Sequence, residues 1–235
     1  MPEPRVAAGG PAGFWTRYVA YSLDALPLAA LAVALAWPRL SAGAARWVEA
    51  ARAMADATAA TLVAALQAGG DPAHLATGLL HAPALREAIA GFSTAFQAWL
   101  WPFALAFALC SLPYHALFEA SRWQGSPGKR LLGLRVTDRG GAPPSLPRSL
   151  LRNAAGALSW LTLNLGHALA ALPPDKRALH DYVAGTRVLA RAPRPLPGWA
   201  RAWLATQAIA VAWLCVAAGT WWARALDAAL LRALG

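Results

Sequence analysis

Residues 17–37 read RYVAYSLDALPLAALAVALAW, and this stretch decides the fold class. From 18 to 37 the chain holds one acid, Asp24, and no base. About 20 such residues, at a rise of roughly 1.5 Å each, suffice to cross the hydrocarbon core of a membrane. Two further stretches, 97–118 and 202–223, contain no Asp, Glu, Lys or Arg. The sequence therefore predicts three membrane-spanning helices.

The composition supports this prediction. Of the 235 residues, 58% are hydrophobic, only 14% are charged and twelve are Trp, which is too apolar for an ordinary soluble domain. A net charge of +10 suggests nucleic-acid binding in a soluble chain, but in a membrane protein the positions of the bases matter more, and we expect no nucleic-acid partner. Cys110 and Cys215 fall inside predicted spans, where we expect apolar packing residues and no metal site.

The distribution of bases predicts the orientation. The segment 119–149 holds six bases against two acids, and such an excess beside a span marks the cytoplasmic side. We therefore expect a multi-pass protein of a bacterial-type plasma (inner) membrane with a cytoplasmic N-terminus. The long segment 38–96 is neutral, with Ala, Val and Leu at helical spacing after Ser41, and is predicted to form an outer helical hairpin stacked on the bilayer surface.

A fourth apolar stretch, 154–172, carries no charge and is long enough to cross. The next segment, 173–201, is strongly basic, so a simple crossing would place its charges on the wrong side. Asn164, Gly166 and His167 give the stretch a polar centre, which favours a hairpin that dips in and returns to the cytoplasm. The final span would then cross outward and leave an amphipathic tail outside.

Two short segments read as strands: RLLGLRVT, residues 130–137, and TRVLA, residues 186–190. A short helix is expected over 178–184, with Gly185 ending it. The predicted fold class is all-α: a polytopic membrane helical bundle with a small cytoplasmic cap that holds the two strands.

The motifs FWTRYVAYSLDAL, GSPGKRLLGLRV, SLLRN and LHDYVAGTRV follow one another in this order, and with them the chain resembles the RDD family of membrane proteins. In this resemblance Arg17 and Asp24 match the family's first Arg and Asp, and Asp181 matches its second Asp. It implies a single RDD-type membrane domain over 1–235, with 38–96 as an outer insertion and 202–235 as an extra C-terminal span and tail. The family resemblance also implies an integral membrane protein for which transport has been proposed, and sodium–proton antiport claimed for one member.

Asp24 needs partners, because an acid at the centre of a spanning helix costs about 2.5–3.5 kcal/mol on insertion scales. Arg17 lies seven residues away, or ~10 Å along the helix, so a direct pair would stretch both side chains and a bridging group is expected instead. Asp181, with its neighbour His180, is expected to meet Arg17. Side chains that could bond to Asp24 or its surroundings are Tyr18, Tyr21, Ser22, Ser111, Tyr114 and His115.

Two interpretations of Arg17, Asp24 and Asp181 remain open. They could form one buried network that binds a proton or a monovalent cation, since burial raises the pKa of an acid. Alternatively, Asp24 caps free backbone groups near Pro27 or the broken helix, while Arg17 and Asp181 clamp the cytoplasmic segment. Lys129 and Arg130 could contact anionic lipid or simply form a solvated basic face.

The preferred function is transport of ions or small solutes through this network, which in so small a bundle would require a homo-oligomer. The alternative is a non-transporting membrane scaffold or assembly factor that binds a partner protein. No catalytic grouping, metal-ligand spacing or cofactor motif is recognisable, so we expect no enzyme, no metal and no cofactor. The lipid bilayer is the one partner that every reading shares.

Overall fold

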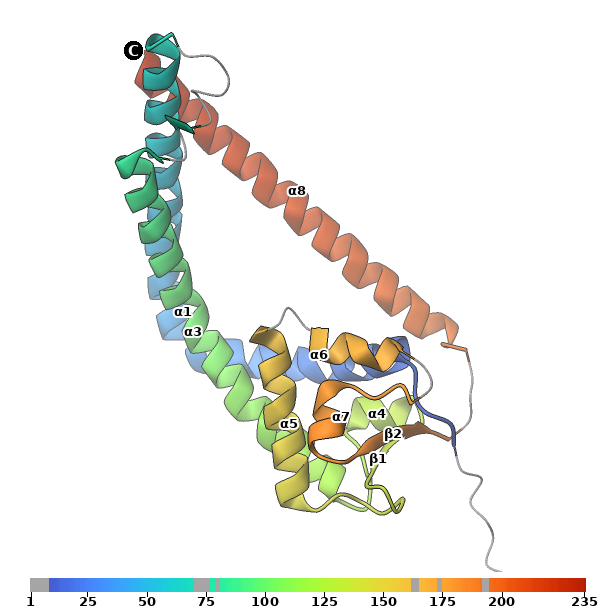
Figure 1. Ribbon diagram of the computed structural model, residues 1–235. Helices are drawn as coiled ribbons and strands as arrows, with labels where there is room; N and C mark the ends of the chain where they lie inside the picture. The colour runs from blue at the N-terminus through green and yellow to red at the C-terminus, as the bar shows by residue number, and fades with distance from the viewer. Residues whose placement is uncertain (1–8, 70–76, 79–80, 162–164, 173–174, 192–194) are drawn as a thin grey trace, which may run out of the picture. The chain divides into compact units, whose positions relative to one another are not determined.

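The structure is a computed structural model and describes residues 9–69, 77–78, 81–161, 165–172, 175–191 and 195–235. Helices make up most of these residues (Figure 1). The chain divides into two compact units. The first unit contains the described residues up to Ala34 together with Leu105–Ala205, and the second contains Leu35–Ala104 and Thr206–Gly235.

Three helices are long and apolar enough to cross a membrane: α1 (Phe14–Gln67), α3 (Pro83–Ala120) and α8 (Gly198–Leu234). These helices contain the three stretches predicted from the sequence, and the prediction of three apolar helices is confirmed. Each helix begins in one unit and ends in the other, so the chain passes between the units three times.

The segment 38–96 is helical up to Gln67 and again from Pro83, and both parts continue the long helices α1 and α3 instead of forming a separate hairpin. α1 continues through Pro38 and Ser41 without interruption, so the predicted helix start at Ser41 is wrong. The Ser41 hydroxyl instead donates within the helix, to the carbonyl of Pro38 at 3.2 Å. A Pro costs a helix one backbone hydrogen bond, and apolar spanning helices tolerate this.

In the second unit, helix packing depends on aromatic and small side chains. Trp47 of α1 stacks on Trp99 of α3 with ring centroids 5.0 Å apart, and Phe92 and Phe96 complete the cluster. Near the C-terminus, Ala229 of α8 is buried with alanines of α1. The predicted amphipathic tail is therefore the continuation of α8, packed on α1.

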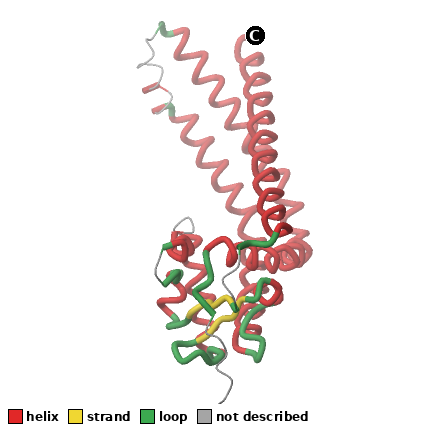
Figure 2. Tube along the Cα trace, turned by 90° about the vertical axis from the view of Figure 1, so that its right-hand side faces the viewer, coloured by secondary structure: helices red, strands yellow, loops and turns green. Residues whose placement is uncertain are grey.

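The first unit contains a two-stranded antiparallel sheet, β1 (Leu134–Thr137) and β2 (Arg187–Ala190), with Leu134 opposite Ala190. The strand predicted over 186–190 is confirmed, whereas the one predicted over 130–137 forms only from Leu134, because Arg130 and Leu131 end a short helix. Figure 2 shows both strands among the loops of an otherwise helical chain. The segment before α1 adds a bridge from Pro11 to Leu189 on the free side of β2. The core under the sheet is small and apolar: Ala12, Ala20, Leu134, Val136 and Val188.

Short helices surround the sheet: α4 (Pro127–Leu131), α5 (Leu146–Leu161), α6 (Leu165–Ala168), the 3-10 turn η1 (Leu169–Ala171) and α7 (Leu179–Val183). The helix predicted over 178–184 is confirmed, and Gly185 follows it with φ +63°. In Figure 1, α4 and α7 lie beside the strands, and α5 and α6 both contact α7.

The stretch 154–172 is divided between α5, α6 and η1, and its described parts contain no helix long enough to span. α5 and α6 contact each other, as a hairpin requires; Asn164 lies outside the described residues. The α5 helix exposes Leu151 to 51% while burying Arg152 and Ser149. A helix that buries its polar side chains and exposes leucine suits the membrane interface. That the stretch dips in and returns to the cytoplasm stays a prediction.

Candidate functional site

The Asp24 carboxylate sits in the apolar part of α1 and is 2% exposed. It accepts hydrogen bonds from Ser126 Oγ at 2.5 Å, from the Gly128 backbone N–H at 2.8 Å and from Tyr114 Oη at 3.0 Å. Ser126 is the N-cap residue of α4 and its own side chain does not cap the helix. Asp24 therefore caps α4 from another helix, about a hundred residues away in sequence, and satisfies one of its free N–H groups, that of Gly128.

Gly128 makes this capping possible. A Cβ atom at this position would lie 2.2 Å from the carbonyl oxygen of Ala20 and 2.8 Å from Asp24 Oδ2. Only a residue without a side chain lets the backbone of α4 approach α1 so closely. The turn GSPG, residues 125–128, thus serves as a docking point for α1.

Arg17 lies two turns before Asp24 on the same face of α1 and does not bond to it. Its guanidinium donates to Asp181 Oδ2 at 2.5 Å, to the Lys176 carbonyl at 2.5 Å and to the Ala12 carbonyl at 3.0 Å. Asp181 also accepts from the backbone N–H of Ala178 at the start of α7. Arg17 therefore joins α1 to three places: the segment before α1 at Ala12, the segment before α7 at Lys176, and α7 itself at Asp181.

Arg152 occupies the centre of a second set of contacts. Its Nε donates to Asp181 Oδ1 at 3.1 Å and its Nη1 donates to Glu119 Oε1 at 2.5 Å. Glu119, at the end of α3 and fully buried, also accepts from Lys129 Nζ at 2.5 Å and from Asn153 at 3.1 Å. Four helices, α3, α4, α5 and α7, are thereby connected through two carboxylates.

The charges in this site balance. Its bases are Arg17, Lys129 and Arg152, and its acids are Asp24, Glu119 and Asp181. Each base contacts an acid, while Asp24 is bonded to neutral donors. We call the five paired residues, without Asp24, the charge cluster.

The pKa values in α5 and α7 follow from this geometry. Burial alone would raise the pKa of Asp181, but the neighbouring Arg152, His180 and Arg17 hold it well below its usual range. Burial would lower the pKa of Arg152, and the carboxylates of Glu119 and Asp181 reverse this and raise it. Burial and then Arg152 lower the pKa of His180 to about 3, so its Nε2, 3.2 Å from Arg152 Nη2, acts as an acceptor.

A comparison with known protein families matches residues 11–185 to the RDD family. The chain belongs to the RDD family. Two curated relatives of this RDD chain come from Bacillus subtilis (strain 168). "Uncharacterized protein YxaI" is 34% identical over 88 residues, which are 37% of this chain and 58% of the relative. "Uncharacterized protein YckC" is 40% identical over 72 residues, 28% of this chain and 48% of the relative.

The RDD chain thus spans about half the length of the curated relatives it matches. No solved structure matches it. The finding of family membership agrees with the three apolar helices and makes this chain a membrane protein of the RDD family.

The structure places the three RDD residues in two separate contacts. Arg17 meets Asp181, and Tyr114 bonds to Asp24, as the sequence analysis expects. The expectation of one continuous Arg17–Asp24–Asp181 network is wrong, because Asp24 caps α4 instead. Asp24 does cap a backbone group, as the second interpretation proposed. This group is the Gly128 N–H of α4, however, and does not lie near Pro27 or in the broken helix.

Lys129 requires a second correction. It is 8% exposed and bonded to Glu119, so its ammonium is not available to an anionic lipid. Its neighbour Arg130 is exposed and remains accessible. One side of the five-residue helix α4 is buried and the other is exposed, so Lys129 is buried although its neighbour Arg130 is exposed.

Sequence reasoning missed Glu119, Arg152, Ser126 and Gly128 as site residues. Glu119 directly follows the apolar stretch 97–118, and an acid in that position is normally expected to be exposed to solvent at the end of the helix. Arg152 carried a usable signal, because Ser149, Ala155 and Gly156 lie beside it at helical spacing in an otherwise leucine-rich helix. Small residues around one Arg indicate a face that packs closely.

Proposed function

We propose that this RDD protein is a non-transporting membrane scaffold that binds a partner protein, with the charge cluster and Asp24 fixing its cap to its spans. The observation that carries the proposal is the closed set of contacts around Arg152, in which both carboxylates are shared between bases. A buried pair of this kind holds one arrangement, because separating it leaves a desolvated charge without compensation. We propose no catalytic step.

The pKa of Asp181 supports a structural role. A group that exchanges protons during transport needs a pKa near the working pH, and Asp181 lies far below it. Asp181 is also bonded on both oxygens, to Arg17 and to Arg152. A substrate cation at this point would have to displace an arginine that is itself buried.

Ion transport remains a second candidate, and one observation favours it. Among the described residues, every hydrogen-bond donor to Asp24 is neutral: Tyr114, Ser126 and the Gly128 N–H. No base in the described part of the chain is bonded to Asp24, so its charge is left for a transported cation. The two candidates make different predictions for the variant Asp24→Asn.

The test is proton flux in proteoliposomes that carry a pH-sensitive dye, under sodium and potassium gradients. The scaffold proposal expects wild type, Asp24→Asn and the exposed control Glu49→Gln to match protein-free liposomes. It also expects a partner to co-purify from membranes at a fixed ratio. Cation-dependent flux in wild type and Glu49→Gln that disappears in a folded Asp24→Asn protein would overturn the scaffold and establish transport.

We further propose that the cap faces the cytoplasm of a bacterial-type plasma membrane and that the chain crosses three times. Three passages between the units and the basic content of 119–149 support this orientation. The test labels single cysteines in a Cys110→Ser/Cys215→Ser background with a membrane-impermeant reagent. Gly235→Cys should react on intact cells and Pro195→Cys only after permeabilisation; reaction of Pro195→Cys on intact cells would refute three crossings.

A further inference from the structure

A groove of about 660 Å³ runs between α1 and α3 inside the second unit. Its size falls within the roughly 300–1,000 Å³ of common ligand sites. Small and apolar residues dominate its lining: Pro38, Ala42, Gly43, Gly91, Ala95, Ala98 and Pro102. Gly43 lets the helices approach, since a Cβ there would lie 3.3 Å from Trp99. The remaining lining residues are Thr94 and two arginines, Arg39 and Arg46.

The two arginines are the polar feature of this groove. They lie seven residues apart on α1, about 10 Å along the axis and on one face. Both are exposed, and within the described part of the chain no ion pair involves either of them. A pair of unneutralised guanidinium groups above an apolar floor is complementary to an anion that carries an apolar chain.

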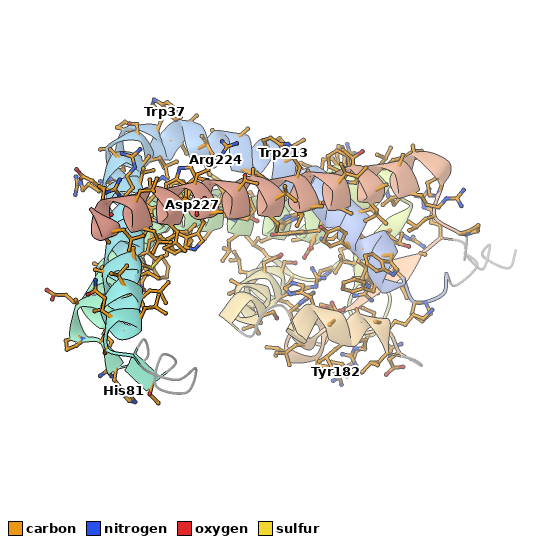
Figure 3. All side chains as sticks on the ribbon, turned by 90° about the horizontal axis from the view of Figure 1, so that it is seen from above. Trp37, His81, Tyr182, Trp213, Arg224 and Asp227 are labelled. Atoms are coloured by element: carbon orange, nitrogen blue, oxygen red, sulfur yellow. The ribbon has the colours of Figure 1, made fainter. Side chains whose placement is uncertain are left out.

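Tryptophans place the groove at the edge of a membrane. Trp37 ends the apolar run of α1 one residue before the groove and is 61% exposed; Figure 3 shows it pointing away from its helix. Trp101, near the start of the apolar run of α3, lies beside the groove residue Pro102 and is 64% exposed. Exposed Trp concentrates at the level of lipid head groups. The arginines therefore lie at head-group depth, next to the apolar spans.

We propose that this groove binds one anionic phospholipid, with the phosphate between Arg39 and Arg46 and an acyl chain along the alanine and glycine floor. This site is distinct from Lys129 and Arg130, and it is independent of whether the protein transports or scaffolds. Lipid is favoured over free phosphate because the floor gives a small anion nothing to contact. Arg supplies paired donors that fit the phosphate oxygens.

The experiment titrates the full chain, purified in detergent, with phosphatidylglycerol or phosphatidylcholine of equal chain length and counts bound lipid by native mass spectrometry. The test variant is Arg39→Gln/Arg46→Gln. The matched control, Arg52→Gln/Arg86→Gln, removes the same amount of charge outside the groove, with one arginine taken from each of the helices α1 and α3 that form it. A third variant, Ala98→Leu, fills the floor and keeps both arginines.

Wild type and the control should bind one phosphatidylglycerol more tightly than phosphatidylcholine. The double groove variant should lose about thirty-fold in affinity for phosphatidylglycerol, because each arginine at a membrane surface contributes roughly five-fold and the two contributions multiply. Ala98→Leu should weaken both lipids. Equal binding of the two lipids by wild type, an equal loss in the control, or full displacement by soluble glycerol phosphate would each overturn the proposal.

Discussion

Replacing Gly128 by Ala tests the contact that holds α4 on α1. The added Cβ would lie 2.2 Å from the Ala20 carbonyl oxygen, which belongs to a buried part of a long helix. The small helix α4 must then move away, and the bond from the Gly128 N–H to Asp24, 2.8 Å long, is lost. Overpacking costs about 1–3 kcal/mol and a hydrogen bond to a charged group about 1.5–3 kcal/mol. The expected loss of stability is their sum, about 2.5–6 kcal/mol.

The assay is denaturant unfolding of the purified protein in detergent, followed by tryptophan fluorescence. Gly140→Ala is the matched control, since its nearest neighbour would be Asp138 Oδ1 at 3.4 Å in an exposed turn, and a change within about 0.5 kcal/mol is expected. The pair Gly128→Ala and Asp24→Ala should be less than additive, because both break one contact. Stability of Gly128→Ala equal to that of the control would refute the capping of α4 by Asp24.

Three further outcomes are expected. Glu119→Gln should destabilise the protein by about 3–5 kcal/mol in the same unfolding assay, because Lys129 and Arg152 then stay buried without their shared acid; a loss no larger than that of exposed Glu49→Gln would contradict this. His180 has a folded pKa of about 3 against roughly 6.5 unfolded, so its burial in the neutral form loses stability as the pH falls between these values. His180→Gln should make that pH dependence shallower, and an unchanged slope would show that His180 is protonated when folded. Arg232→Gln should change stability by less than about 1 kcal/mol, since its 2.6 Å pair with Asp56 is more than half exposed; a larger loss would mean that the α8 end depends on this pair.

The sequence was sufficient for features that depend on local pattern. Apolar length predicted the three long apolar helices, and alternation predicted β2 and the residues of β1, although it began the first strand four residues too early. The free-energy cost of placing an acid in a spanning helix predicted that Asp24 has hydrogen-bond partners. Tyr114, which bonds to it, was one of the six candidates. In each case the evidence lies within a window of about 20 residues.

Partners that are distant in the sequence could not be read in the same way. Asp24 caps a helix that begins at Pro127, and no periodicity connects the two. Lys129 and Arg130 have the same chemistry and adjacent numbers, yet one is buried on Glu119 and the other is exposed. Their difference comes from which side of α4 faces α1, and the close approach at Gly128 decides that side.

The length of a helix was misjudged for a physical reason. Ser41 after Pro38 is a typical start signal, but a start signal has an effect only where the preceding backbone leaves the helix. In α1 the apolar residues before Pro38 already form a helix, and the Ser41 hydroxyl bonds back to it. Packing of Trp47 on Trp99 then stabilises the continuation more than capping would favour a break.

The two contacts of the site also explain why damage by mutation alone would not indicate transport. Arg152 contacts Asp181 and Glu119, Arg17 contacts Asp181 and Lys129 contacts Glu119, so removing Glu119 leaves Lys129 without an acid and removing Asp181 leaves Arg17 without one. Such a cluster is sensitive to the loss of either acid even when no ion moves through it. Asp24 differs, because Asn keeps its size and still accepts from the Gly128 N–H while losing the charge. A loss of activity in Asp24→Asn without loss of folding therefore reports on the charge itself, whereas the same loss in Asp181→Asn reports first on the architecture.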